Sequence, residues 1–227
     1  MGKALFRVPR LVFVLLACTP LASHATNLTF TLGSATPSFT DGTILGGNPI
    51  TTFNTAVAGN AAPFNGYIGT DVNGPSFSAS WAYNYASVGG TISSATITLG
   101  LFDADSQASG NQVASFTLGG VDLTSLLNTA LEGHGGANSE YDIYTITLPS
   151  STFAALSGGT PGLSLSLQGP GLGAAGLSTT FNGAGLDFST LSITTGTTSA
   201  APEPGTWALL AAGIAGLVSY CRRASRV

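Results

Sequence analysis

Two aspartates, Asp103 and Asp105, are the residues of this chain whose type and spacing best suit a chemical role. They begin a loop, residues 103–111, that follows a predicted strand and is rich in oxygen-bearing side chains. Calcium takes about six to eight oxygen ligands from carboxylates, amides and backbone carbonyls, so the loop is a candidate calcium site. It lacks the glycine and the glutamate that an EF-hand requires, and aspartates after a strand are often solvated turn formers. Both interpretations stay open.

His134 is the one histidine outside the amino-terminal segment, and it lies in a glycine-rich loop, residues 132–136. With Glu140 or Asp142 and a serine it could form a hydrolytic triad. The sequence, however, has no G-x-S-x-G nucleophile elbow. One imidazole also falls short of a usual zinc site. We therefore expect a protein that is not an enzyme and has no obligate cofactor.

Three aromatic side chains alternate along one predicted strand. They are Trp81, Tyr83 and Tyr85. Rings on one face of a strand can stack on sugars, but they can equally fill a core, and Phe77 and Ala79 share their face. Because aromatic side chains carry a large apolar area, the pattern favours the core. A loop over residues 60–71 carries Phe64 and Tyr67 and is a second possible sugar-contact patch.

The charges of the chain are strongly segregated. Every lysine and arginine lies in the first ten or the last six residues. The chain has 10 acids, and Glu203 is the only one outside residues 26–201, which leaves nine there. A domain with acids and no cations repels nucleic acid, so we expect no nucleic-acid partner. Both cysteines, Cys18 and Cys221, lie in the end segments, so a disulfide framework is excluded.

Residues 26–194 carry the pattern of a single all-β domain. Apolar and polar residues alternate in short runs between glycine-rich turns, which is typical of antiparallel strands with one buried face. The runs lie at residues 28–32, 77–85, 97–101, 113–118, 141–148, 163–167 and 186–193. Together they predict an antiparallel, jelly-roll-like β-sandwich. Asp122 should cap a short helical insertion through Leu131, with a further helical turn at residues 151–156. Residues 195–201 read as a flexible linker.

The amino-terminal segment has the features of a secretory signal peptide. Three basic residues precede a short apolar run, residues 11–17, and small residues at 23–25 suit signal peptidase. The basic residues are Lys3, Arg7 and Arg10. We therefore expect residues 1–25 to be removed and Thr26 to begin the mature chain. The alternative is a lipoprotein, because residues 15–18 resemble a lipobox in which Cys18 would carry lipid.

The carboxyl-terminal segment, residues 202–227, has three parts in a fixed order. Pro202, Glu203 and Pro204 come first, an apolar run over residues 207–221 follows, and a basic cluster ends the chain. The cluster consists of Arg222, Arg223 and Arg226. The apolar run predicts a hydrophobic helix that anchors the chain in a membrane, with the arginines on the cytoplasmic side. Its length is marginal for a permanent transmembrane helix.

This segment resembles the PEP-CTERM sorting signal, which occurs in exported proteins of Gram-negative bacteria that also make exopolysaccharide. The resemblance implies an exosortase-like enzyme as a partner and Pro202, Glu203 and Pro204 as its recognition motif. It also implies that the helix holds the precursor transiently in the inner membrane, with the arginines as the membrane stop. It says nothing about the activity of residues 26–194.

The sequence therefore predicts an exported structural or adhesive protein of the cell envelope, cell surface or extracellular matrix, with exopolysaccharide as a possible partner. The alternative is a glycan-binding β-sandwich module, with calcium as an assisting ion. The strand aromatics separate the two hypotheses, because exposed rings favour the glycan binder and buried rings favour the structural role.

Overall fold

The computed structural model describes residues 25–173, 177–196 and 204–224. The chain divides into two units. One is the domain Ala25–Thr197, and the other contains the carboxyl-terminal helix. Several expectations fall outside the described residues. They concern the signal peptide before Ala25, Cys18, linker residues 197–201, Pro202, Glu203 and Arg226.

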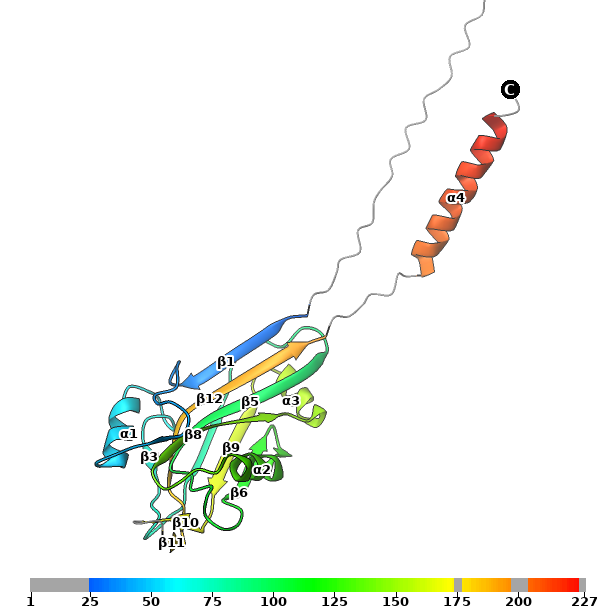
Figure 1. Ribbon diagram of the computed structural model, residues 1–227. Helices are drawn as coiled ribbons and strands as arrows, with labels where there is room; N and C mark the ends of the chain where they lie inside the picture. The colour runs from blue at the N-terminus through cyan, green and yellow to red at the C-terminus, as the bar shows by residue number, and fades with distance from the viewer. Residues whose placement is uncertain (1–24, 174–176, 197–203, 225–227) are drawn as a thin grey trace, which may run out of the picture. The chain divides into compact units, whose positions relative to one another are not determined.

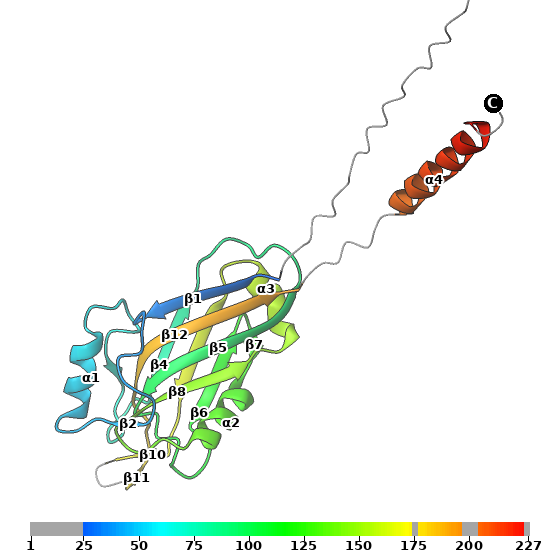
Figure 2. The ribbon, with the colours of Figure 1, turned by 45° about the horizontal axis from the view of Figure 1, so that its top comes forward.

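The first sheet of the domain is antiparallel throughout, and its long strands lie side by side in Figures 1 and 2. Its order is β1 (Asn27–Gly33), β12 (Ala184–Thr195), β5 (Ile92–Phe102), β8 (Glu140–Thr147) and β2 (Thr43–Ile44), and β3 (Tyr67–Ile68) also pairs with β12. The first and last strands of the domain are therefore neighbours, with Phe30 opposite Leu191.

The second sheet is also antiparallel and is shorter. Its order is β4 (Ser78–Ala82), β9 (Gly162–Leu167), β6 (Val113–Leu118) and β7 (Val121–Asp122). A separate pair, β10 (Gly171–Leu172) and β11 (Ser178–Thr179), lies at the end of the domain away from the start of β1 (Figure 1).

The two sheets share one hydrophobic core. Alternate residues of β5 and of β9 are buried in it, as the two-residue period requires. They are Ile97, Leu99, Leu101, Leu163, Leu165 and Leu167. Each fully buried leucine or isoleucine contributes roughly 1.5–3 kcal/mol relative to an exposed one. The expectation of an all-β antiparallel fold is thus confirmed at this level: the domain is mostly β, with antiparallel sheets and a few short helices.

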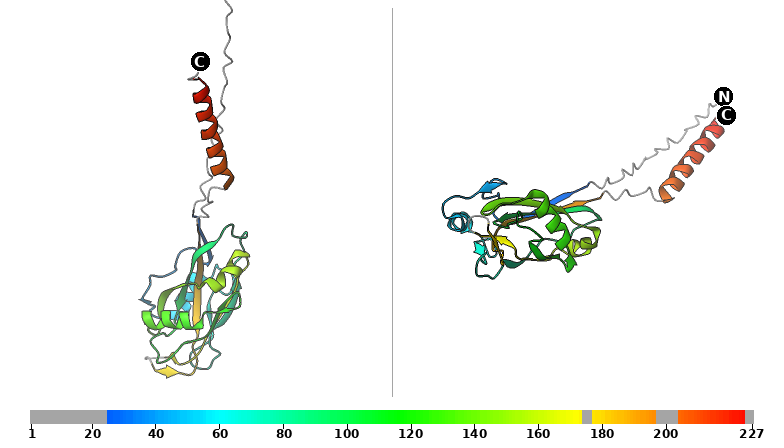
Figure 3. Two further views of the ribbon diagram at one scale, coloured as in Figure 1. Left: turned by 90° about the vertical axis from the view of Figure 1, so that its right-hand side faces the viewer. Right: turned by 60° about the horizontal axis from the view of Figure 1, so that its bottom comes forward.

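Helix α2 (Thr124–His134) corresponds to the predicted helical insertion but is placed slightly later in the chain. Asp122 belongs to β7, and its Oδ1 accepts hydrogen bonds from the amide and the hydroxyl of Thr124 at 2.9 and 2.6 Å. The helix continues past Leu131 to His134, where Gly135 adopts a left-handed conformation and ends it. It packs against β6 and β8, one strand of each sheet, and lies along the outside of the domain in Figure 3.

Two further helical segments complete the domain. The predicted turn at residues 151–156 is found as η1 (Ser150–Thr152) followed by α3 (Phe153–Ser157). Helix α1 (Pro49–Val57) was not predicted. Its cap is Asn48, whose Oδ1 accepts the amide hydrogen of Thr51 at 3.2 Å, and Pro49 occupies the first turn, where no amide donor is needed.

The domain ends where its first and last strands meet. β12 includes Thr195, one residue beyond the boundary expected from sequence, and the Thr195 amide donates to the Thr26 carbonyl at 2.9 Å. Thr195 is therefore a strand residue and not the start of the linker, because the ladder between β12 and β5 extends to it, with Thr195 opposite Ile92.

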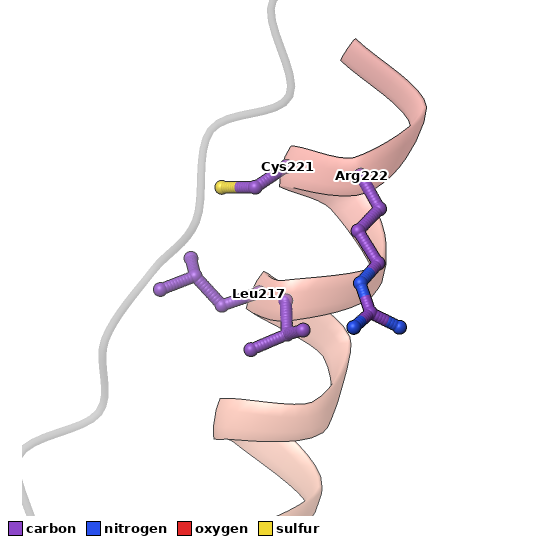
Figure 4. A pocket seen from close by; sticks show the side chains of 4 residues that line it. Leu217, Cys221 and Arg222 are labelled. Atoms are coloured by element: carbon purple, nitrogen blue, oxygen red, sulfur yellow. The ribbon is translucent and has the colours of Figure 1, made fainter. Parts of the chain in front are cut away.

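Helix α4 (Pro204–Ala224) contains the predicted apolar run. It begins at Pro204, three residues before the predicted apolar run; a proline fits the first turn because no helical amide donor is required there. Among the described residues, no helix is both long enough and apolar enough to cross a membrane, so the predicted transmembrane helix is not confirmed. A shallow hollow on α4 is lined by Leu217, Val218, Cys221 and Arg222 (Figure 4).

Candidate functional site

The loop that follows β5 places Asp103 and Asp105 in the interior of the domain. The chain turns at both residues, with φ of 61° and 54°, a left-handed conformation that aspartate tolerates better than most side chains. Only 4 % of Asp103 and 1 % of Asp105 are exposed. The interpretation of these residues as solvated turn formers is therefore wrong.

Asp71 joins these two aspartates through Tyr67, and the three form what we call the acidic cluster. The Tyr67 hydroxyl lies 3.1 Å from Oδ2 of Asp103 and 3.3 Å from both carboxylate oxygens of Asp71. The carboxyl of Asp105 shares a side-chain hydrogen bond with that of Asp103, and a backbone amide donates to each of Asp103 and Asp71. The amide of Ser139 donates to Oδ1 of Asp103 at 2.5 Å, and that of Gly183 donates to Oδ1 of Asp71 at 2.6 Å.

Asp105 and Asn182 each hold a buried oxygen without a hydrogen-bond partner in the described structure. Oδ2 of Asp105 accepts the Leu172 amide at 2.6 Å, but its Oδ1 has no partner. Asn182 is fully buried, and its Nδ2 donates at 3.0 Å to the carbonyl of Ala104, the residue between the two loop aspartates. Oδ1 of Asn182 is also unpartnered. Buried polar atoms are normally satisfied, so each of these oxygens requires an explanation.

The electrostatics of the acidic cluster follow from its burial. Burial raises the pKa of Asp105, and the charges of Asp103 and Asp71 raise it further. Burial likewise raises the pKa of Asp103, opposed by the Ser139 amide and supported by the charge of Asp71. The pKa of Asp71 is also raised, mainly by burial. The protein environment therefore disfavours three ionised carboxylates in this place.

His134 lies between two carboxylates at the end of α2, the helix that packs against β8. Its Nε2 is 3.1 Å from Oδ2 of Asp41, and its Nδ1 is 3.5 Å from Oδ1 of Asp142. Partial burial lowers the pKa of His134, but the hydrogen bond to Asp41 and the charge of Asp142 outweigh this effect and the pKa is raised. Burial and the charge of Glu140 raise the pKa of Asp142 to about 6.

This arrangement brings His134 to Asp142 as a triad would, but both ring nitrogens contact carboxylates and neither contacts a serine hydroxyl. The absence of enzymatic activity stays a prediction. Asp41, His134 and Asp142 could each offer one ligand atom to a metal ion, within 4.8 Å of one another. Asp41 could not be identified from the sequence, because no local pattern links it to His134 or Asp142.

The aromatic residues near β4 face the core, as expected. Trp81 is 8 % exposed and Tyr83 is 1 % exposed. Both bond to the buried hydroxyl of Ser189 on β12: Trp81 Nε1 donates to it at 3.2 Å, and the Tyr83 hydroxyl lies 2.7 Å from it. Tyr85 stacks on Phe30 with ring centroids 4.1 Å apart.

The second possible sugar-contact patch, residues 60–71, also points inward. Phe64 is buried and meets Trp81 edge to face, with centroids 5.9 Å apart. Tyr67 belongs to β3 and directs its hydroxyl at the acidic cluster. This segment is therefore part of the core and of the cluster, and it offers no exposed aromatic platform through these two residues.

The recognisable sequence motif of the chain lies outside the domain. Residues 200–223 match the PEP-CTERM protein-sorting motif, which confirms the resemblance seen in the sequence. The motif implies an exported, envelope-directed protein processed by an exosortase-like system. Within the described part of this segment, Arg222 and Arg223 lie in the last turn of α4.

Comparison with other proteins adds little about the domain. No curated protein matches the chain. A solved structure of a family 35 carbohydrate-binding module from an environmental isolate aligns with 74 % of this chain and 93 % of that chain, at 13 % identity and a TM-score of 0.32. A likeness this distant supports no conclusion about what this chain binds.

Proposed function

We propose that this chain is an exported structural or adhesive protein of a Gram-negative cell envelope or extracellular matrix, where exopolysaccharide is its natural surrounding. Its domain, residues 26–195, acts as a jelly-roll-like β-sandwich, and its carboxyl-terminal segment is the sorting signal. The main observation in support of this proposal is the match of residues 200–223 to the sorting motif.

The local structure suits a processing signal. Glu203 directly precedes α4 in the sequence, and the ring of Pro204 disfavours helical backbone at the residue before it, so the helix starts at Pro204. Glu203 is the only charged residue between Asp187 and Arg222, so it is a distinctive handle for a cationic pocket in a membrane enzyme. Arg222 and Arg223 follow the apolar part of the helix and act as the stop for its transfer.

The buried aromatics support a structural role for the domain over glycan recognition. A sugar platform needs rings that solvent can reach, whereas Trp81 and Tyr83 bond to Ser189 inside the core. Tyr85 is covered on one face by Phe30. The glycan-binding alternative would therefore have to use other residues.

The test is intact mass analysis of the protein recovered from a host with an exosortase and from the same host without it. We expect the exosortase-containing host to yield protein without the arginine tail, and the deletion host to yield the full carboxyl end. Glu203→Ala should be exported but keep Arg222, Arg223 and Arg226. Glu132→Ala, which removes an exposed acid of α2, is the matched control and should be processed normally.

If wild-type protein from the exosortase-containing host keeps its arginine tail, processing does not occur and the sorting proposal fails. Normal processing of Glu203→Ala would leave the sorting route in place but remove Glu203 from the recognition motif.

A further inference from the structure

Phe39 is a half-buried aromatic side chain that two buried rings hold in place. Its ring lies edge to face with Tyr141 of β8, with centroids 5.5 Å apart, and its centroid is 6.4 Å from that of Phe53 of α1. It packs on a second, smaller apolar cluster, which consists of Leu45, Phe53, Val57, Phe102, Tyr141 and Phe188. Because Phe39 is fixed and not fully covered, it offers a firm apolar surface to a ligand.

The loop that carries Phe39 is fixed by Asp187, a fully buried residue of β12. The Asp187 carboxylate accepts hydrogen bonds from the amide and the hydroxyl of Ser38, each at 2.8 Å, and from the hydroxyl of Ser34. It also accepts the hydroxyl of Tyr141 at 2.7 Å. Asp187 thus joins the residue before Phe39 to the tyrosine against which Phe39 packs. A ligand that contacts Phe39 therefore meets a pre-organised surface and loses little free energy in ordering it.

Two hollows in the surface of the domain lie against Phe39. One has a volume of about 710 Å³ and the other of about 440 Å³, and Phe39 lines both. Figure 2 shows α1 and the loop before it beside the β2 end of the first sheet, where these residues lie. Volumes of this size are typical of small-ligand sites, and two hollows that share one ring suit an extended ligand with repeated units.

The remaining lining of both hollows is rich in oxygen. Thr40, Thr43 and Asp41 line the larger hollow. Asn48, Thr51 and Thr55 line the smaller one. Hydroxyl and amide side chains both donate and accept hydrogen bonds, which are the two roles that sugar hydroxyl groups also take. An aromatic ring bordered by such groups combines a stacking surface with polar contacts, as recognition of a sugar requires.

Asp41 determines which charge the ligand can carry. Its Oδ1 accepts the Ile143 amide hydrogen at 2.7 Å and its Oδ2 lies 3.1 Å from Nε2 of His134, yet its side chain is 47 % exposed. An ionised carboxylate offers about four lone-pair sites, so Asp41 can still accept hydrogen bonds from a ligand. No lysine or arginine occurs between residues 11 and 221 to attract an anion. The site therefore favours a neutral ligand with hydroxyl groups over an acidic one.

We propose that Phe39 and the two hollows beside it form a binding site for a neutral polysaccharide chain. One sugar ring stacks on Phe39, and hydroxyl groups of the chain bond to Asp41 and to the threonines of the lining. This inference rests on the adhesive role proposed above and gives that role a site. It does not require exposure of Trp81 or Tyr83, which belong to the core that the two sheets share.

The first experiment is native electrophoresis of the full chain in gels that contain a polysaccharide. The neutral polysaccharides are laminarin, hydroxyethylcellulose, dextran and galactomannan, and a detergent without a sugar headgroup keeps the chain soluble. We expect at least one of them to retard the chain and alginate, which is acidic, to leave its mobility unchanged. Unchanged mobility in all the neutral gels would overturn the proposal. Equal retardation by alginate would also contradict it, because the site would not select a neutral ligand.

Phe39→Leu tests whether the aromatic ring makes the contact. Leucine keeps an apolar side chain on the cluster but removes the flat ring face, so affinity for the retarding polysaccharide should fall at least about tenfold. Phe153→Leu is the matched control, because it makes the same change at a half-buried position on α3, and it should keep the wild-type affinity. Unchanged affinity of Phe39→Leu would place the sugar elsewhere and refute the site.

A second variant keeps the proposal testable if Phe39→Leu fails to fold. Ala56 is exposed on α1 and lines the smaller hollow, so Ala56→Gln fills part of that hollow without entering the core. Glutamine is a good helix former, so the fold should be kept while retardation falls. Ala154→Gln, at an exposed position on α3, should leave retardation unchanged, and full retardation of Ala56→Gln would contradict the site.

These assays measure binding by the purified chain and do not involve exosortase. Loss of the proposed binding would therefore leave processing of the arginine tail as the separate test of the sorting route. A retained arginine tail would likewise refute sorting without changing the mobility of the chain in a polysaccharide gel.

Discussion

Ser189 is the residue on which the buried arrangement of the aromatic side chains depends. Its hydroxyl lies inside the core on β12, 3.2 Å from Nε1 of Trp81 and 2.7 Å from the hydroxyl of Tyr83. Ser189→Ala removes this shared partner and leaves two buried polar groups without it. The substitution creates almost no cavity, so its effect reports the hydrogen bonds rather than the packing.

The expected loss can be estimated from the two groups left unpaired. A buried polar group without a partner costs about 1–3 kcal/mol, which gives roughly 2–6 kcal/mol for Trp81 and Tyr83 together. In a domain of this size each kcal/mol lowers the melting temperature by about 2–4 °C. Ser189→Ala should therefore melt roughly 4–24 °C below the wild type.

The assay is urea unfolding of a fragment spanning residues 25–197, which we expect to fold cooperatively because it holds every strand of both sheets. The chain has two tryptophans and the second is Trp207, so Trp81 is the only one in the fragment and its fluorescence follows the site directly. Ser192→Ala is the matched control. It makes the same chemical change on β12 at a half-buried position on the other face, and it should cost under about 0.5 kcal/mol.

The reasoning would be refuted if Ser189→Ala were no more destabilising than Ser192→Ala. The same conclusion would follow if Trp81 of the wild type emitted like a solvent-exposed indole, or if oligosaccharides shifted its emission. Emission typical of an exposed indole, or a shift of the emission by oligosaccharides, would mean that the rings are accessible to solvent. It would restore glycan binding as the leading function of the domain.

Two further predictions concern the mature end and the histidine. Sequencing of the protein isolated from cells should find Thr26 first, because residues 23–25 form the cleavage site, and an acylated Cys18 would instead establish the lipoprotein alternative. The pKa of His134 is raised in the folded state, so its contacts with Asp41 and Asp142 stabilise the fold below the unfolded pKa and are lost as pH rises through the folded value. His134→Ala should therefore lower the melting temperature slightly at pH 5.5, by less than the equivalent of about 1 kcal/mol, and leave it unchanged at pH 9. Equal effects at both pH values would show that packing, and not charge, accounts for the loss.

The sequence predicted strands best where buried and exposed residues alternate with a period of two. The alternation at residues 113–118 and 163–167 corresponds to β6 and β9, because each strand has one face in the core. Helix α1 escaped prediction because only Phe53 and Val57 of its residues are buried, which is too short an apolar pattern to stand out. Asn48 and Pro49 were the available signal, since together they are a recognised helix start.

Of the residues in and beside the acidic cluster, only Asp103 and Asp105 could be predicted from the sequence. The spacing of Asp103 and Asp105 after a strand was visible, but their burial was not, because polar turn residues are usually exposed. Asp71 and Asn182 reach the cluster through the pairing of β3 with β12, which depends on strand register and on no local motif. Asp41 meets His134 for a similar reason, through contacts between segments far apart in the chain.

The charge distribution links the sorting segment to the acidic cluster. The lysines and arginines lie only at the two ends, where export and sorting use them, and residues 26–201 keep nine acids. If both ends are removed as proposed, the mature domain carries no lysine or arginine, so the buried carboxylates of Asp71, Asp103 and Asp105 rely on hydrogen bonds and protons for compensation.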